Sequence, residues 1–393
     1  MTACTGSGVV TGSAAAQPVP VSTADPFYTA PADLAEHANG AVLRSREIVP
    51  VGLIGAPPTR AWQVQYRSSD GAGLPTTVVA TIAVPTTPWT EPGPRPLLGL
   101  QIAEDSLGPQ CAPSHYLRMG LAAGINNSTF STTEAASALR RNWAVVISDY
   151  EGPRARFLDA GQTAHGVLDG LRATRSFAPA GLADSPIATI GYSGGAIATA
   201  WAAQQQPSYA PELELAGVAL GGVPADLPSA IAKVNRGSNA GLGLLLLAAF
   251  HRLAPEADIP ALLNDRGRRM LAENANACGL EFVVKYLFAN IDDYTAATNI
   301  GADPRIRAIG ETTRLDRTTP TAPIYLWHST DDDVLPAERT DALVDTWCAT
   351  GGRITYVRPH GQNHVAASPA GYPAAMDYLA QRFTGAIPPT GCA

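Results

Sequence analysis

The sequence predicts an α/β protein in which a mostly parallel central sheet is flanked by helices and carries a helical insertion. Between residues 97 and 220, apolar runs of strand length alternate with stretches of helical spacing, which is typical of parallel strands joined by right-handed crossovers. One such run, at 187–190, ends in a glycine-rich turn and continues as a helical segment of small residues at 196–205. From residue 223 to 313 the pattern is helical and rich in Leu and Ala, which predicts the insertion.

Length and composition exclude several classes of function. The 393 residues exceed one average domain. A net charge of −7, with 16% charged residues, provides no basic surface for nucleic acid. The most apolar stretch, residues 241–250, is far shorter than the ~18 residues of a membrane span. Because no Cys or His spacing typical of zinc is present, the sequence predicts neither a metal nor a cofactor.

The N-terminal residues 1–25 are expected to form a flexible tail, because they are mainly Ser, Thr, Gly, Ala, Val and Pro without a periodic apolar pattern. They lack the basic and apolar regions of a complete signal peptide. Met1-Thr2-Ala3-Cys4 is similar to the end of a bacterial lipobox, which makes Cys4 a candidate lipid anchor; the alternative is an unmodified thiol. Disulfides among the five cysteines would leave one unpaired and favour a secreted or cell-surface protein.

The first part of the core is expected to span residues 26–222. Pro, Gly and Asp turns separate its first three strands, which predicts an antiparallel start to the sheet. Ser131-Thr132-Thr133-Glu134 matches a capping box and predicts a helix that begins near residue 130. The expected strands are 47–54, 61–66, 76–84, 97–103, 143–149, 187–190 and 213–220, and a further helix is expected at 161–177.

The turn Gly191-Tyr192-Ser193-Gly194-Gly195 lies at the centre of the pattern. It matches the G-x-S-x-G nucleophile elbow, in which a serine occupies a strained strand-to-helix turn. Gly191 and Gly195 avoid collisions that side chains would cause there. Ser193 is therefore the predicted nucleophile. The backbone N–H of Gly194 would face the oxyanion that forms when Ser193 attacks a carbonyl.

Residues 223–313 are expected to form a lid, and this range is called the lid segment below. Within it, the apolar stretch 241–250 predicts either a fully buried helix or a lid wall that faces lipid when the lid is open. The second part of the core, residues 314–393, is expected to contain strands at 323–328 and 353–358 and helices at 338–350 and 374–383.

Titratable residues follow both of these last strands, where ligands meet an α/β sheet. Asp331, Asp332 and Asp333 follow the first, and His364 follows the second. The order serine, acid, histidine is the α/β-hydrolase order. His364 would be the general base for Ser193, with a carboxylate holding its tautomer. His328 and His360 remain alternatives for the base.

The sequence resembles the secretory lipase family typified by Candida antarctica lipase A. The resemblance runs through most of residues 26–392 and is carried by the shared order of short motifs. These are Asp25-Pro26-Phe27-Tyr28, Glu104-Asp105, Cys111-Ala112-Pro113-Ser114, Ser148-Asp149-Tyr150-Glu151-Gly152, the elbow, Trp327-His328 through Pro336, and His364. It implies an α/β-hydrolase fold with a helical lid.

The same resemblance implies roles that the residues alone leave open. It selects Asp332 as the catalytic acid, although Asp331 or Asp333 remains an alternative. It assigns the second oxyanion donor to the backbone N–H of Asp105. It also implies the disulfides Cys111–Cys278 and Cys348–Cys392, with Cys4 unpaired. This chain ends just after Cys392, where the yeast enzyme has a further segment over its site, so access to the site is expected to be more open.

The leading functional prediction is a secreted serine esterase or lipase that hydrolyses fatty-acyl esters, including those of glycerol, through an acyl-enzyme. Its expected partners are a small ester or lipid substrate and a lipid interface contacted by the lid segment. An acyltransferase that uses the same three residues is a second hypothesis. A catalytically inactive lipid-binding envelope protein is a third, and intact Ser193, Asp332 and His364 argue against it.

Overall fold

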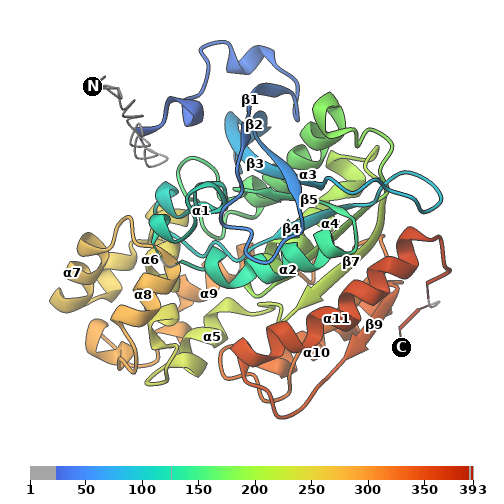
Figure 1. The fold of residues 1–393 in the computed structure, drawn as a ribbon. Helices are drawn as coiled ribbons and strands as arrows, with labels where there is room; N and C mark the ends of the chain where they lie inside the picture. The colour runs from blue at the N-terminus through green and yellow to red at the C-terminus, as the bar shows by residue number, and fades with distance from the viewer. Residues whose placement is uncertain (1–23, 125, 389–390, 393) are drawn as a thin grey trace, which may run out of the picture.

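A computed structural model describes residues 24–124, 126–388 and 391–392. Within this part of the chain, nine strands form one twisted sheet in the order β1-β2-β3-β5-β4-β6-β7-β8-β9 (Figure 1). The strands are β1 (Val42–Ile48), β2 (Thr59–Ser69), β3 (Pro75–Pro85), β4 (Leu97–Gln101), β5 (Ala144–Ser148), β6 (Ile187–Tyr192), β7 (Leu215–Gly221), β8 (Ile324–Trp327) and β9 (Ile354–Val357).

The sheet is antiparallel at one edge and parallel elsewhere. β1, β2, β3 and β5 pair antiparallel, and from β5 through β9 every neighbouring pair is parallel. The predicted α/β class, the antiparallel start and the mostly parallel sheet are therefore confirmed. The carboxyl ends of β6, β8 and β9 consequently lie at one edge of the sheet, which brings the segments that follow them together.

Helices cover both faces of the sheet (Figure 1). On one face, buried residues of α3 (Ala160–Ser176) and α4 (Gly194–Tyr209) pack into the larger apolar core. On the other face, α2 (Ser128–Arg140) and α11 (His364–Phe383) contribute to the second core. The remaining core helices are α1 (Pro113–Met119) and α10 (Ala337–Ala349).

The lid segment separates β7 from β8 and lies at the lower left of Figure 1. Its α-helices are α5 (Leu227–Val234), α6 (Ala240–Leu253), α7 (Asp265–Glu273), α8 (Gly279–Lys285) and α9 (Pro304–Thr312). In α6, the side chains of residues 243–250 are buried, so this apolar helix belongs to the core in the present state of the protein.

Two expected helix starts are wrong. α2 begins at Ser128, so Ser131 lies inside the helix and does not cap it; instead Asn126 Oδ1 accepts a hydrogen bond from the Ser128 N–H. α11 begins at His364, ten residues before the expected start, and continues through Pro369 and Pro373. Those prolines broke the helical pattern in the sequence, but the Asn363 side chain caps the helix start by accepting from the Ala366 N–H.

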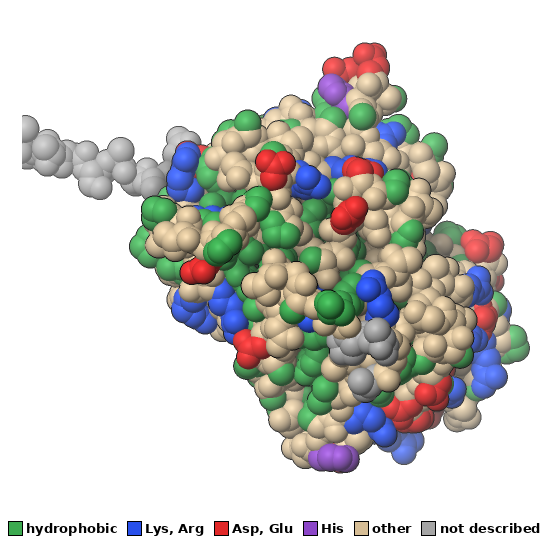
Figure 2. Space-filling view, turned by 90° about the vertical axis from the view of Figure 1, so that its right-hand side faces the viewer, with side chains coloured by type: hydrophobic (Ala, Val, Ile, Leu, Met, Phe, Trp, Pro, Cys, Tyr) green, Lys and Arg blue, Asp and Glu red, His purple; other side chains and the backbone are tan. Residues whose placement is uncertain are grey.

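The first predicted strand is also displaced. β1 ends at Ile48, and residues 49–58 form a loop between it and β2. On the face shown in Figure 2, acidic and basic side chains are interspersed with apolar ones and form no large field of one sign. Among the described residues, no helix combines the length and apolar character that a membrane crossing requires.

Candidate active site

Ser193 occupies a strained turn between β6 and α4. Its φ of 53° and ψ of −122° lie outside the regions that non-glycine residues usually adopt. The flanking glycines explain how the turn closes. A Cβ at Gly191 would lie 2.1 Å from the Gly195 carbonyl oxygen, and a Cβ at Gly195 would lie 2.0 Å from the Gln101 carbonyl oxygen. The turn therefore has the geometry expected of a nucleophile elbow.

The structure brings the three predicted side chains into one hydrogen-bonded row. His364 Nε2 lies 2.8 Å from Ser193 Oγ, and His364 Nδ1 lies 2.7 Å from Asp332 Oδ2. Tyr192 contacts His364 twice: its hydroxyl donates to the His364 carbonyl oxygen at 2.6 Å, and the centroids of the two rings lie 5.1 Å apart. Such a row can move a proton from the serine hydroxyl to the imidazole.

The Asp332 carboxylate is buried but well supported. Oδ1 accepts hydrogen bonds from the backbone N–H groups of Val334 and Leu335, at 2.8 and 2.7 Å. Burial alone would raise the pKa of Asp332, but its contacts with His328 and His364 outweigh burial and hold the pKa well below its usual range. Asp332 is therefore ionised at neutral pH.

The alternative acids and bases occupy other environments. Asp331 is exposed and accepts from the Gly361 N–H, while Asp333 accepts from the backbone N–H of His364 rather than from its ring. His360 pairs with Thr330. His328 is completely buried on the far side of Asp332 and does not contact Ser193.

The loop after β4, residues 102–112, brings Asp105 to the cavity that Ser193 and Gly194 also line. Asp105 has a positive φ of 43°, and its carboxyl lies against Gly194, where an added Cβ would be 1.9 Å from Oδ1. Oδ1 is buried without a hydrogen-bond partner among the described residues. Burial raises the pKa of Asp105 to about 7, against a smaller opposite effect of His364.

Three more carboxyl groups are buried here: Glu104 belongs to this loop, and Asp149 and Glu151 follow β5. Burial raises the pKa of Asp149 to about 7 and the pKa values of Glu104 and Glu151 well above their usual range. The Asp105 and Ser106 backbone N–H groups oppose the rise at Glu151. No periodic pattern could have revealed this cluster, because its members come from two separate segments.

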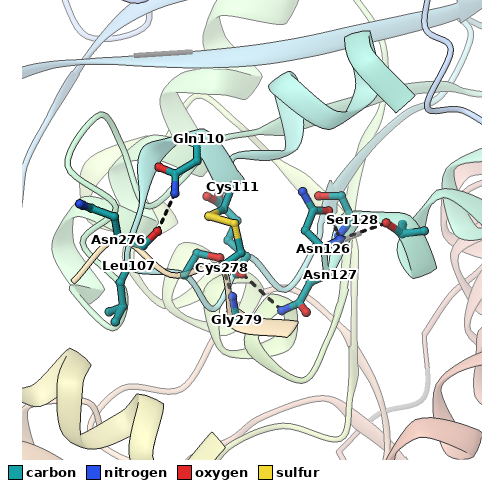
Figure 3. The surroundings of a disulfide bond; sticks show 12 residues. Leu107, Gln110, Cys111, Asn126, Asn127, Ser128, Asn276, Cys278 and Gly279 are labelled. Carbon is teal, nitrogen blue, oxygen red and sulfur yellow. Dashed lines mark hydrogen bonds between the residues drawn. A yellow bond between two sulfur atoms is a disulfide. The ribbon is translucent and has the colours of Figure 1, made fainter. Parts of the chain in front are cut away.

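A disulfide joins the loop after β4 to the lid segment (Figure 3). Cys111 and Cys278 are bonded, with their Cα atoms 5.5 Å apart. Beside them, Gln110 donates to the Asn276 carbonyl oxygen at 2.6 Å and the Gly279 N–H donates to Ser106 Oγ at 3.3 Å. The second disulfide, Cys348–Cys392, ties the C-terminal segment to α10. Both expected pairings are present.

A small apolar cavity lies directly above Ser193. Its volume of about 20 Å³ has room for roughly one water molecule. The lid segment covers it with Leu227 and Ala230 of α5 and with Leu242 and Leu246 of α6. Phe157 and Ile197 line the opposite side. The structure therefore describes a covered site with an apolar lining.

No group of His, Cys, Asp or Glu side chains in the described ranges is arranged to hold a metal ion. Cys4, the candidate lipid anchor, lies outside the described residues, so its modification stays a prediction.

Comparison with known proteins gives three consistent findings. The family profile described as "Secretory lipase" matches residues 123–391. Lipase A of Arthroderma benhamiae is 33% identical over 393 residues, covering 95% of this chain and 82% of the relative. A probable inactive lipase of Mycobacterium tuberculosis is also 33% identical, over 369 residues, covering 92% of this chain and 82% of the relative.

Among solved structures, Candida antarctica lipase A in its closed state superposes with a TM-score of 0.86 at 29% identity. The match covers 95% of this chain and 89% of that one. A rice cell wall degrading esterase from Xanthomonas oryzae has a TM-score of 0.69 at 16% identity, which concerns the fold alone.

Proposed function

This chain belongs to the secretory lipase family and is a carboxylic-ester hydrolase with the α/β-hydrolase fold, and we propose that it cleaves fatty-acyl esters through Ser193, His364 and Asp332. The observation that carries the proposal is the row of contacts at 2.8 and 2.7 Å that links the strained serine to a buried carboxylate through one imidazole. Membership in a secretory family supports export, as do the two disulfides.

The reaction proceeds through an acyl-enzyme. Ser193 Oγ attacks the ester carbonyl carbon while His364 Nε2 accepts the hydroxyl proton, and Asp332 stabilises the imidazolium that forms. Collapse of the tetrahedral intermediate breaks the ester C–O bond, and His364 returns the proton to the leaving alkoxide, which departs as an alcohol. Water then attacks the acyl-enzyme by the same route and releases the carboxylic acid.

The oxyanion of each intermediate would be stabilised by the backbone N–H groups of Gly194 and Asp105. Gly194 is the first residue of α4, so the helix N-terminus adds a favourable dipole. The Asp105 N–H lowers the pKa of the buried Glu151 carboxyl, but neither Glu151 carboxyl oxygen has a hydrogen-bond partner among the described residues.

The substrate is expected to be apolar on its acyl side. The residues above Ser193 are hydrophobic, and the cavity is far too small for an acyl chain in the covered state. The lid segment must therefore move before substrate binds. Hydrophobic residues of α5 and α6 that line the cavity would then be available to contact the acyl chain or a lipid interface.

Hydrolysis of p-nitrophenyl esters of increasing chain length, with wild type and Ser193→Ala, tests the proposal. We expect kcat to fall by at least about 10⁴-fold in the variant, and a fluorophosphonate to label the wild type alone. Unchanged turnover in the variant would refute Ser193 as nucleophile. A wild type that folds but neither turns over nor labels would place this chain with an inactive lipase. Adding a competing alcohol and identifying the products distinguishes acyl transfer from hydrolysis.

A further inference from the structure

The catalytic acid has a second imidazole partner. Asp332 Oδ2 lies 2.7 Å from His364 Nδ1 and 3.2 Å from His328 Nε2, so one carboxylate oxygen is shared by two histidine rings. The side chains of His328 and Asp332 are both fully buried. Nε2 of His328 makes no hydrogen bond of good geometry within the described residues, and the Asp332 carboxylate at 3.2 Å is the charged group that it contacts. The row of contacts therefore does not end at Asp332.

The far side of the His328 ring is also held. Nδ1 lies 2.8 Å from Thr340 Oγ1 on α10, and Thr340 Oγ1 lies 3.3 Å from the Val223 carbonyl oxygen at the start of the lid segment. Thr340 has one hydroxyl proton. It can donate to Nδ1, which leaves the ring hydrogen on Nε2, or to Val223, in which case Nδ1 carries a hydrogen. An Nε2 without hydrogen would set its lone pair against the Asp332 carboxylate 3.2 Å away, so the forms with hydrogen on Nε2 are favoured.

The other contacts of the acid leave Oδ2 as the atom that His328 controls. Oδ1 is fixed by two backbone N–H groups, from Val334 and Leu335. Rotation of the Asp332 carboxyl plane would therefore displace Oδ2 and distort its hydrogen bond to His364. A carboxylate that also interacts with a second imidazole is a weaker acceptor toward the first, because its negative charge is shared.

We propose that His328 is a positioning residue for the reaction: it holds Asp332 Oδ2 in line with His364 and shares the charge of the carboxylate. The proposal rests on the proposed function, since it needs Asp332 to be the catalytic acid. His328 does not touch the reacting atoms and acts only through Asp332. The remaining titratable groups around His364 are Asp333, which accepts from its backbone N–H, Tyr192, and Asp105 across the cavity.

Two substitutions separate this role from a structural one. In His328→Gln the side-chain amide nitrogen takes the place of Nε2, so the donor to Asp332 is kept and the bond to Thr340 is lost. In His328→Asn the amide takes the place of Nδ1, so the bond to Thr340 is kept and the donor to Asp332 is lost. Thr340→Val removes the outer bond alone and serves as the matched control.

We expect His328→Asn to lower kcat by about 10- to 100-fold, the range for losing one hydrogen bond to a charged group, with KM nearly unchanged. The acidic limb of its kcat/KM profile should move to higher pH by about 0.5 to 1 unit, since the unshared carboxylate stabilises the His364 imidazolium more strongly. His328→Gln should recover most of kcat and the wild-type profile. Thr340→Val should lower the thermal midpoint without moving the profile.

The rate of fluorophosphonate labelling reports the same effect without substrate binding, and thermal unfolding verifies that each variant folds. If Ser193→Ala abolishes activity while His328→Asn folds with wild-type kcat and an unmoved profile, the inference is overturned and the proposed function stands. If the Asn and Gln variants fold and lose activity equally, His328 has only a structural role. Full activity of Ser193→Ala would instead refute the proposed function itself.

Discussion

Three consecutive aspartates, Asp331, Asp332 and Asp333, differ only in what surrounds them. Asp331 is exposed and bonded to a loop N–H, and Asp333 accepts from the backbone of His364. Asp332 alone contacts the His364 ring, and its contacts keep it ionised despite burial. The residue type is the same at all three positions. What distinguishes Asp332 is therefore the direction in which its carboxylate points and the burial and contacts of that carboxylate.

Asp332→Asn is expected to lower kcat by about 10⁴-fold, because an amide favours the wrong tautomer of His364 and leaves the imidazolium without its counter-charge. Asp331→Asn is the control and should keep wild-type kcat, since its carboxyl faces solvent. Steady-state kinetics on one p-nitrophenyl ester suffices for both. If Asp331→Asn lowered kcat more than Asp332→Asn does, Asp331 would be the catalytic acid in place of Asp332.

At the scale of elements, the loop after β4 and the N-terminal end of α8 behave as one unit. Besides the Cys111–Cys278 bond, the Leu107 N–H donates to the Ala277 carbonyl oxygen at 3.0 Å, and a Cβ at Gly279 would lie 2.2 Å from the Asp105 carbonyl oxygen. The proposed oxyanion donor is thus packed directly against the lid segment. Movement of that segment is expected to disturb the donor unless the disulfide holds this end in place.

The two disulfides should therefore differ in their effect on catalysis. Replacing both Cys111 and Cys278 by Ser is expected to cost about 2–5 kcal/mol of unfolding free energy and also to lower kcat. Replacing Cys348 and Cys392 should lower stability by a similar amount but leave kcat unchanged, because Cys392 pairs with Ile354 at the start of β9, whereas His364 follows the other end of that strand. Thermal unfolding and kcat measured on both double variants test this. Equal kcat in the two would show that the first disulfide does not support the oxyanion loop.

For the whole molecule, the buried carboxyl groups around the loop after β4 predict how stability depends on pH. Burial raises the pKa of Asp105 and of Asp149 to about 7, from an ordinary value of 3.8. Between about pH 4 and 7 the folded protein therefore binds more protons than the unfolded chain, and stability falls as pH rises through this window. Asp332 acts oppositely, because its lowered pKa contributes stability that is lost only in strong acid.

The thermal midpoint is therefore expected to be higher at pH 5 than at pH 8. Asp149→Asn should flatten the decline, because the amide does not ionise; its oxygen can accept from the Ser114 N–H, and its NH₂ can donate to Ser114 Oγ in place of accepting from it. Asp345→Asn, an exposed position on α10, should leave the profile as in wild type. Differential scanning fluorimetry across pH 4 to 9 measures all three proteins. A wild-type midpoint that rises from pH 5 to 8 would contradict the prediction.

The sequence by itself determined the α/β class, the strand-to-helix turn at Ser193, the order serine, aspartate and histidine of the proposed catalytic residues, and the helical pattern of the lid segment. Each of these features depends on residues that are adjacent in the sequence or on apolar residues that recur at a short spacing, so local backbone preferences suffice to predict it. The same reliance on local pattern produced the errors. Pro369 and Pro373 concealed the start of α11 at His364, and a capping-box match lay inside α2.

Only the tertiary structure decided which atoms meet. Selection of Asp332 and both disulfide pairings rested on resemblance, and the contact of His328 with Asp332 had no sequence signal beyond a spacing of four residues. The clustered carboxyl groups and the covered cavity likewise join segments distant in the chain. The burial of a carboxyl group determines whether it is ionised, and the direction of a side chain determines which acceptor a donor reaches. Both depend on residues that only the packed fold brings together, so a pattern along the sequence does not encode them.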